Sequence, residues 1–219
     1  MAELVPEGWY DITLMMKQGM HNLILDPTKP KIYRLHEAAL GSPVTITMLE
    51  ILTHTGTHID CPLHFIWGGS TVSDMPLDAT LGAARVIEIE HPAIITPEEL
   101  EKHDIQKGER ILCKTSNSPT VYESKEWIED YVYLGEEAAK YLAEKQIRLF
   151  GMDAITVGDY RDDASIHATH RALLEAGIYI LEGCALGGVP AGEYELVCLP
   201  LRILSGDASP CRAILRPLG

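Results

Sequence analysis

Residues 135–153 read GEEAAKYLAEKQIRLFGMD and place a helical pattern directly before a strand pattern. Ala139 and Leu142 share one face of a helix predicted over 135–145. The apolar run that follows, at 147–152, has the length and composition of a buried strand. A helix joined to a strand in this way predicts an α/β unit packed on a sheet.

The rest of the chain extends this alternation. A helix predicted at 167–176 leads into a strand at 178–182, and Thr96, followed by a proline and two glutamates, caps the start of another helix. Strands outnumber helices, and no repeat or low-complexity linker divides the chain. We therefore expect an α/β fold with a mixed sheet and a single domain over residues 1–219. The other predicted strands are 44–52, 85–90, 110–115 and 194–199.

The charge of the chain excludes several classes of partner. Its 219 residues include 18 basic and 32 acidic side chains, for a net charge of −14, and no cluster of Lys and Arg interrupts this excess. Such a field repels nucleic acid and anionic membrane surfaces. Residues 1–7 lack a signal-peptide pattern, and no run approaches the roughly 18 apolar residues of a membrane span. We expect a cytoplasmic protein whose five widely spaced cysteines are reduced and mostly buried.

The segment HTGTHIDCPLHF, residues 54–65, carries the clearest chemical signal. Gly56 and Pro62 argue against a helix, so the chain is expected to run extended, with Pro62 bending it after Asp60. Alternate side chains of an extended chain share a face, and the other face here is apolar. Imidazole nitrogens with one carboxylate oxygen are ligands that zinc prefers. The side chains predicted to converge on such a cation are His54, His58, Asp60 and His64.

A second pair of candidates lies downstream. His170 falls within a predicted helix, and Glu182 ends the apolar strand that begins at Ile178. Spacing alone favours solvated positions for both, although a carboxylate after such a strand needs a partner or a metal ion. His167 could replace His170 as a ligand. Cys61 could act as a nucleophile, but its parity in the extended chain points it away from the imidazoles.

The motif over 54–65 resembles the signature of the cyclase family of metal-dependent hydrolases. Within that family the chain is most similar to the bacterial kynurenine formamidase (arylformamidase) branch. The resemblance runs from about Trp9 to Arg216, and its C-terminal stretch is what favours this branch. The segments that it includes besides the motif are 76–77, 151–153, 180–183, 189–196 and 207–213.

This resemblance implies a swivelling β/β/α fold, a homodimer or homotetramer, and two divalent metal ions, Zn²⁺ or Mn²⁺. One ion would be bound by His54, His58 and Asp60. Asp60 would bridge to a second ion, and His64 would be the catalytic acid and base. The ligands implied for the second ion, besides Asp60, are His170 and Glu182, with Glu182 touching both ions.

The resemblance also implies a small amide substrate, N-formylkynurenine or a related aryl formamide. Leu23 takes the position at which formamidases carry an aromatic residue that packs on the substrate, and it is a candidate substrate-binding residue. This departure leaves open a second substrate class, a cyclic imide or isatin-like ring opened by the same site. A hypothesis of another class is a metal-binding scaffold without catalytic activity.

Overall fold

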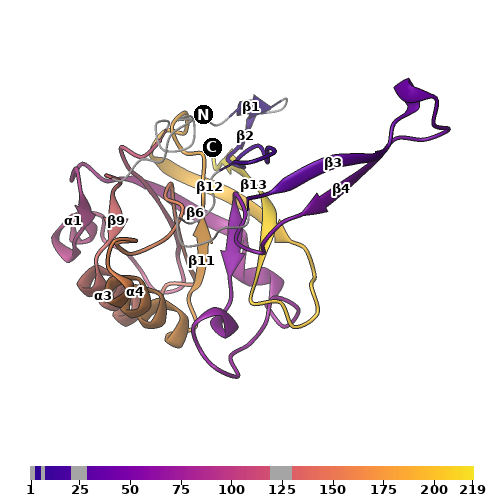
Figure 1. Ribbon diagram of the computed structural model, residues 1–219. Coiled ribbons are helices and arrows are strands. Elements are labelled where there is room, and N and C mark those ends of the chain that lie inside the picture. The colour runs from indigo at the N-terminus through magenta and orange to yellow at the C-terminus, as the bar shows by residue number, and fades with distance from the viewer. Residues whose placement is uncertain (1–2, 6–7, 21–28, 119–129) are drawn as a thin grey trace.

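The computed structural model describes residues 3–5, 8–20, 29–118 and 130–219, and a nine-stranded mixed sheet forms its body (Figure 1). The strands that run parallel are the central ones, β6 with β8, β8 with β10 and β10 with β11. All other pairs in the sheet are antiparallel, so the predicted α/β class with a mixed sheet is confirmed. In spatial order the strands are β1 (Glu3–Val5), β2 (Trp9–Asp11), β13 (Ala208–Pro217), β12 (Gly192–Pro200), β6 (Leu81–Glu88), β8 (Arg110–Lys114), β10 (Leu149–Met152), β11 (Tyr179–Glu182) and β5 (His58–Asp60).

The sheet closes on itself through β5. This short strand pairs with β11 on one side and with β13 on the other, where Asp60 lies opposite Ile180 and Ala208 respectively. The strands from β13 round to β5 therefore form a closed, barrel-like ring. Closure places the motif between two strands whose residues are far from it in the sequence.

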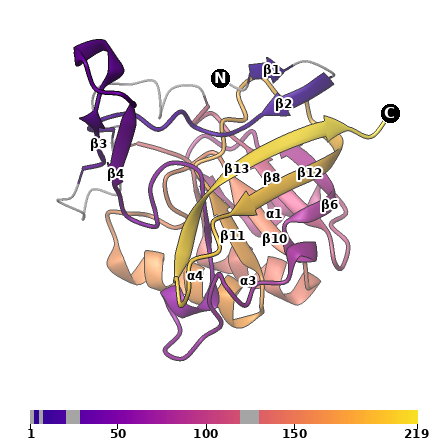
Figure 2. The same ribbon diagram turned by 90° about the vertical axis from the view of Figure 1, so that its right-hand side faces the viewer.

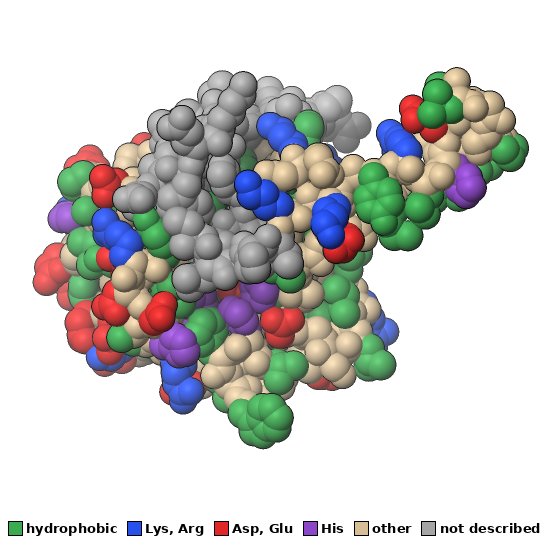
Figure 3. Space-filling view, viewed as in Figure 1, with side chains coloured by type: hydrophobic (Ala, Val, Ile, Leu, Met, Phe, Trp, Pro, Cys, Tyr) green, Lys and Arg blue, Asp and Glu red, His purple; other side chains and the backbone are tan. Residues whose placement is uncertain are grey.

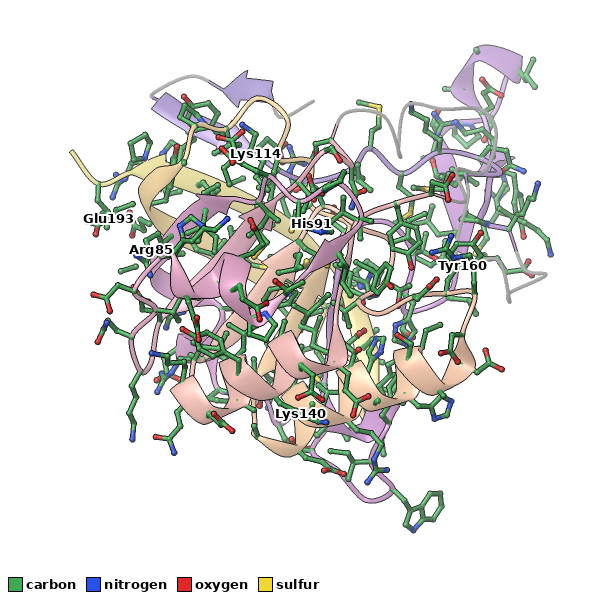
Figure 4. The ribbon with its side chains drawn as sticks, turned by 90° about the vertical axis from the view of Figure 1, so that its left-hand side faces the viewer. Arg85, His91, Lys114, Lys140, Tyr160 and Glu193 are labelled. Atoms are coloured by element: carbon green, nitrogen blue, oxygen red, sulfur yellow. The ribbon has the colours of Figure 1, made fainter. Side chains whose placement is uncertain are left out.

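Three helices lie on one side of the sheet, as Figures 1 and 4 show: α1 (Pro97–Glu101), α3 (Glu136–Lys145) and α4 (Asp163–Glu175). Side chains alternate along β8, so that Ile111 and Cys113 join the core beneath the helices while Leu112 joins the core inside the ring. A two-stranded parallel pair, β7 (Ile94–Ile95) with β9 (Tyr133–Leu134), leads into α1 and α3. Within the described ranges, no helix is long and apolar enough to cross a bilayer.

Most of the predicted elements are confirmed. Strands β8, β10, β11 and β12 and helices α1 and α3 fall within two residues of where the patterns place them, and the Thr96 hydroxyl accepts a hydrogen bond from the Glu99 amide at 3.4 Å. Strand β6 was predicted at 85–90 but begins four residues earlier, at Leu81, and ends at Glu88. The predicted start of α4 at His167 was wrong by four residues. The helix begins at Asp163 because the Asp162 side chain caps it, accepting from the Ala164 amide at 3.0 Å.

A β-hairpin stands away from this body (Figures 1 and 2). Strand β3 (Lys31–His36) pairs antiparallel with β4 (Ile46–Glu50), within the strand predicted at 44–52. We refer to residues 29–52 as the arm. Every residue of β4 is exposed, although its composition is that of a core strand. The arm therefore offers apolar side chains that the described part of this chain does not cover.

Candidate metal centre

The loop before β5 is held tightly against the end of β11. Gly56 and Gly183 both have positive φ, +67° and +70°, and a Cβ on Gly183 would lie 2.6 Å from the Gly56 carbonyl oxygen. The Thr57 hydroxyl donates to the Gly183 carbonyl at 2.6 Å and accepts from the Leu14 amide at 2.8 Å. These contacts leave no space between the two segments, and they fix His58 directly opposite Glu182 in the strand register.

Asp60 lies at the centre of a buried cluster and is itself fully buried. Its Oδ1 atom lies 2.9 Å from Nδ1 of His54 and 3.4 Å from Nε2 of His58. Its Oδ2 atom lies 3.7 Å from Nε2 of His170. The two oxygens of one carboxylate thus face two different sets of imidazoles.

Glu182 links the same two sets from the other side. Its Oε2 atom lies 3.2 Å from Nε2 of His58, and its Oε1 atom lies 3.4 Å from Nε2 of His170. The Val157 amide donates to Oε1 at 2.6 Å and holds the carboxylate in place. His58, His170 and Glu182 are each at most 2% exposed, so the expectation of solvated positions for His170 and Glu182 from spacing alone was wrong.

Backbone carbonyls orient the two most buried imidazoles. Nδ1 of His58 lies 2.9 Å from the Gly56 carbonyl oxygen, and Nδ1 of His170 lies 2.7 Å from that of Ile166. A carbonyl can only accept a hydrogen bond, so in each ring Nδ1 carries a proton, and Nε2 is the nitrogen that can offer a lone pair to a cation. Both Nε2 atoms face the carboxylates, which is the orientation of a histidine that ligates a metal ion.

Three atoms of the cluster are buried without a hydrogen-bond partner among the described residues: Asp60 Oδ1, Asp60 Oδ2 and His58 Nε2. An unpaired buried polar atom costs roughly 1–3 kcal/mol, and more when it is charged. A divalent cation would accept lone pairs from all three. Nitrogen and carboxylate donors together suit zinc and several other divalent ions, so the residues present fit a metal ion.

The pKa values of the clustered side chains are shifted because these groups are buried and lie close to one another. Burial disfavours a charge on His54, but attraction to Asp60 and Asp207 outweighs it and raises the pKa of His54 to about 9. Burial also disfavours the charged form of Asp60, yet the neighbouring His54 and His58 hold its pKa well below the ordinary value. A cation that takes these nitrogens as ligands must displace their protons, so its binding releases protons.

His64 lies at the more open side of the cluster, on a 3-10 turn (Pro62–His64) that follows β5. The predicted bend at Pro62 is thus present. The ring of His64 lies 4.0 Å from that of His54, between centroids, and its side chain is 23% exposed. Figure 3 shows histidine side chains gathered next to an acidic one on this face of the molecule.

Asp207 is a residue of the site that motif spacing did not predict. Its Oδ2 atom lies 2.8 Å from Nε2 of His54 and 3.5 Å from Nδ1 of His64. Asp207 is far from both histidines in the sequence and reaches them because it immediately precedes β13, which pairs with β5. The signal that could have found it is the similarity at 207–213, which begins with this residue.

The structure separates the other candidates. His170 lies in the cluster, whereas His167 is exposed on α4, with its ring edge-on to Phe65 at 5.1 Å. Cys61 points into the core inside the ring, and burial raises the pKa of its thiol to about 12, which disfavours a nucleophilic thiolate. Leu23 lies outside the described residues.

A cavity of about 530 Å³ borders the motif from its other side. Thr55, Gly56 and Thr57 form part of its wall, and Met15, Met16 and Met20 form another part. None of the clustered histidines and carboxylates lines it. The cavity is therefore separate from the atoms that could hold a metal ion.

The ring of strands and the buried set of histidines and carboxylates define a family. The chain belongs to the Cyclase family, whose model matches residues 10–159. It is 42% identical over 176 residues to a kynurenine formamidase of Salinibacter ruber, a match that covers 80% of this chain and 81% of that one.

Solved structures agree on the fold. A structure described as a predicted metal-dependent hydrolase from Bacillus stearothermophilus superposes with a TM-score of 0.81 at 34% identity, covering 94% of this chain and 97% of that one. Isatin hydrolase A from Labrenzia aggregata superposes with a TM-score of 0.78 at 22% identity, covering 96% and 94%. At that identity the second likeness shows a shared fold.

Proposed function

We propose that this protein is a metal-dependent hydrolase that cleaves the carbon–nitrogen bond of a small aryl formamide, N-formylkynurenine or a close relative of it. The observation that carries the proposal is the buried Asp60, whose two unpaired oxygens face two sets of imidazoles. The similarity to kynurenine formamidases over four-fifths of the chain supports the choice of substrate class.

We propose that the site binds two divalent ions, with Zn²⁺ the preferred ion and Mn²⁺ the alternative. His54, His58 and Oδ1 of Asp60 would hold one ion, and His170 with Oδ2 of Asp60 would hold the other. Glu182 would reach both, because its two oxygens lie 3.2 Å and 3.4 Å from His58 and His170. Two carboxylates that each present both oxygens support a pair of ions over a single one.

His64 is proposed as the acid and base of the reaction. When bound, the ions lower the pKa of a nearby water and polarise the substrate carbonyl. His64 takes a proton from the attacking water and delivers it to the nitrogen as the carbon–nitrogen bond breaks, because an amine is a poor leaving group without that proton. The products are formate and the free amine. The partial exposure of His64 allows it to meet substrate while the ligand atoms stay buried.

The substrate class is tested by side-by-side kinetics of metal-loaded protein on N-formylkynurenine and isatin, with metal content measured by elemental analysis. We expect turnover of the formamide, a kcat/KM at least about tenfold above that for isatin, and loss of turnover after chelation, because ligand atoms without a cation cannot activate water. A preference for isatin would establish the cyclic imide alternative. If chelation lowers the Tm but no amide, ester or imide is hydrolysed, the protein is a metal-binding scaffold.

We also propose that the protein is a homodimer or homotetramer held together by the arm. Eight of the fifteen large exposed apolar side chains in the described residues belong to it, and an isolated two-stranded hairpin is marginally stable in water. The arm has three basic and two acidic side chains, which leaves 15 of the 18 basic and 30 of the 32 acidic ones for the rest. A second copy thus presents an acidic body to an arm of opposite net charge.

The arm is tested by placing charge on its apolar face. Tyr33 and Met48 are cross-strand neighbours and share that face with Ile46. The double variant Ile46→Asp, Met48→Asp is expected to shift the protein from a multiple of the monomer mass to the monomer, because the carboxylates would meet an acidic surface. Light scattering during size-exclusion chromatography measures the mass. The control is Leu204→Asp, at a leucine that is 87% exposed outside the arm, and an unchanged mass in the double variant would contradict the proposal.

A further inference from the structure

One carboxylate oxygen lies between the rings of two histidines that have different proposed roles. Oδ2 of Asp207 lies 2.8 Å from Nε2 of His54, a proposed metal ligand, and 3.5 Å from Nδ1 of His64, the proposed acid and base. No other described carboxylate lies within ion-pair distance of the His64 ring. Asp207 is thus the one described acidic group that contacts both rings.

The contact with His54 decides which of its nitrogens faces the cluster. Carboxylate oxygens only accept hydrogen bonds, so the Nε2–H of His54 donates to Asp207. Nδ1 is then the nitrogen on the side of Asp60, whose Oδ1 atom is 2.9 Å away, and it can offer a lone pair to a cation that displaces its proton. A carboxylate behind a ligating histidine fixes the tautomer and the ring orientation and makes the ligand more basic.

The contact with His64 acts on the other ring in the same way. An imidazole held at Nδ1 by a carboxylate has Nε2 as the nitrogen that is left to exchange a proton, and the carboxylate stabilises the imidazolium that forms. The ring centroids of His54 and His64 lie 4.0 Å apart, with the ring planes tilted by 34°, so one carboxylate can reach both.

Asp207 is itself anchored at two points. The Thr53 hydroxyl donates to its Oδ1 atom at 3.1 Å, and its carbonyl oxygen accepts from the Cys61 amide at 3.0 Å. These contacts tie the residue to the segment just before the motif and to the motif itself, and they leave Oδ2 for the histidines. A side chain held in this way is suited to orient its neighbours.

We propose that Asp207 is a positioning residue that couples the two halves of the site, by fixing His54 for cation binding and His64 for proton transfer. The inference rests on the function proposed above, and it adds a residue to that site.

The test compares Asp207→Asn and Asp207→Glu with the unchanged protein, using kinetics on N-formylkynurenine and Zn²⁺ affinity from competition with a chelator. Asparagine keeps the shape but cannot stabilise an imidazolium. We expect Asp207→Asn to lower kcat by about 10–100-fold with KM changed by less than about threefold, and to weaken Zn²⁺ binding by about 10–100-fold. Asp207→Glu is expected to restore most of the loss, because the side chain is 38% exposed and has space to extend. The matched control is Asp78→Asn, at an exposed aspartate paired with Arg148.

Several results would overturn the proposal. Values of kcat and Zn²⁺ affinity within about twofold of the unchanged protein would show that Asp207 positions nothing. Equal losses in both variants, accompanied by loss of folded protein in circular dichroism, would show a purely structural role. If the unchanged protein hydrolyses no substrate, the proposed function fails. The proposed role of Asp207 in orienting His54 can then still be tested, because an unweakened Zn²⁺ affinity in Asp207→Asn would overturn it.

Discussion

Replacing Asp60 with alanine is expected to empty both metal positions at once. Both oxygens of this carboxylate face imidazole nitrogens, so its removal takes one ligand from each set. Mutation of a residue that only hydrogen-bonds to a metal ligand costs about 10–100-fold in metal affinity or activity. Removal of a ligand shared by both ions should therefore lower the metal affinity by more than about 100-fold. Elemental analysis after dialysis and kcat/KM on N-formylkynurenine measure the two effects.

The control for Asp60→Ala must separate ligation from stability, because any buried carboxylate contributes to the fold. Asp153 is also fully buried and accepts hydrogen bonds from the Thr115 hydroxyl and amide and from the Ser118 amide. Asp153→Asn is expected to lower the Tm while the metal content stays unchanged. Metal retained at the original stoichiometry in folded Asp60→Ala would show that the cation does not bind at this cluster.

Replacing His64 with alanine is expected to leave the metal in place and remove most of the turnover. Proton transfer by a positioned side chain contributes about 10²–10⁴-fold, so kcat should fall within that range. The ligand atoms of the other histidines are arranged around Asp60 without His64. Elemental analysis and steady-state kinetics on the same sample distinguish a lost acid and base from a lost ligand.

The distinction matters because ring nitrogens of His54 and His64 and an oxygen of Asp60 lie close enough to share one ion. A fall in metal content with unchanged activity per bound metal would make His64 a ligand. His167→Ala is the matched control, since its ring contacts Phe65 from the exposed side of α4. We expect that variant to keep both its metal and its activity.

The motif was predictable because it is local. Parity in an extended chain places His58 and Asp60 in the strand together, and the structure buries Ile59 in the core inside the ring. The predicted start of α4 was wrong because the apolar pattern is clear only in the later turns of the helix, whereas the helix itself begins directly after its cap at Asp162. Local patterns thus predicted which elements form, and they predicted the helix boundary less well.

The rest depends on contacts between distant segments. Spacing could not choose between His167 and His170, because the choice depends on which face of α4 meets β11. Asp207 had no local signal for contact with His54, since the two come together only through the pairing of β13 with β5. The composition of β4 predicted a strand, and its exposure in the arm could not be read from that composition.

The closure of the ring by β5 has a consequence for how the protein folds. The pairing of Asp60 with Ala208 joins segments that are separated by most of the chain, and contacts of such high sequence separation form late because a long loop must be ordered first. The proposed ligands come from β5 and the loop before it, from α4 and from β11, and the carboxylate of Asp207 immediately precedes β13. A cation is therefore expected to bind only after the whole chain has been made and has folded. A nascent chain that still lacks β13 would contain every proposed ligand but would have no closed ring to hold those ligands together.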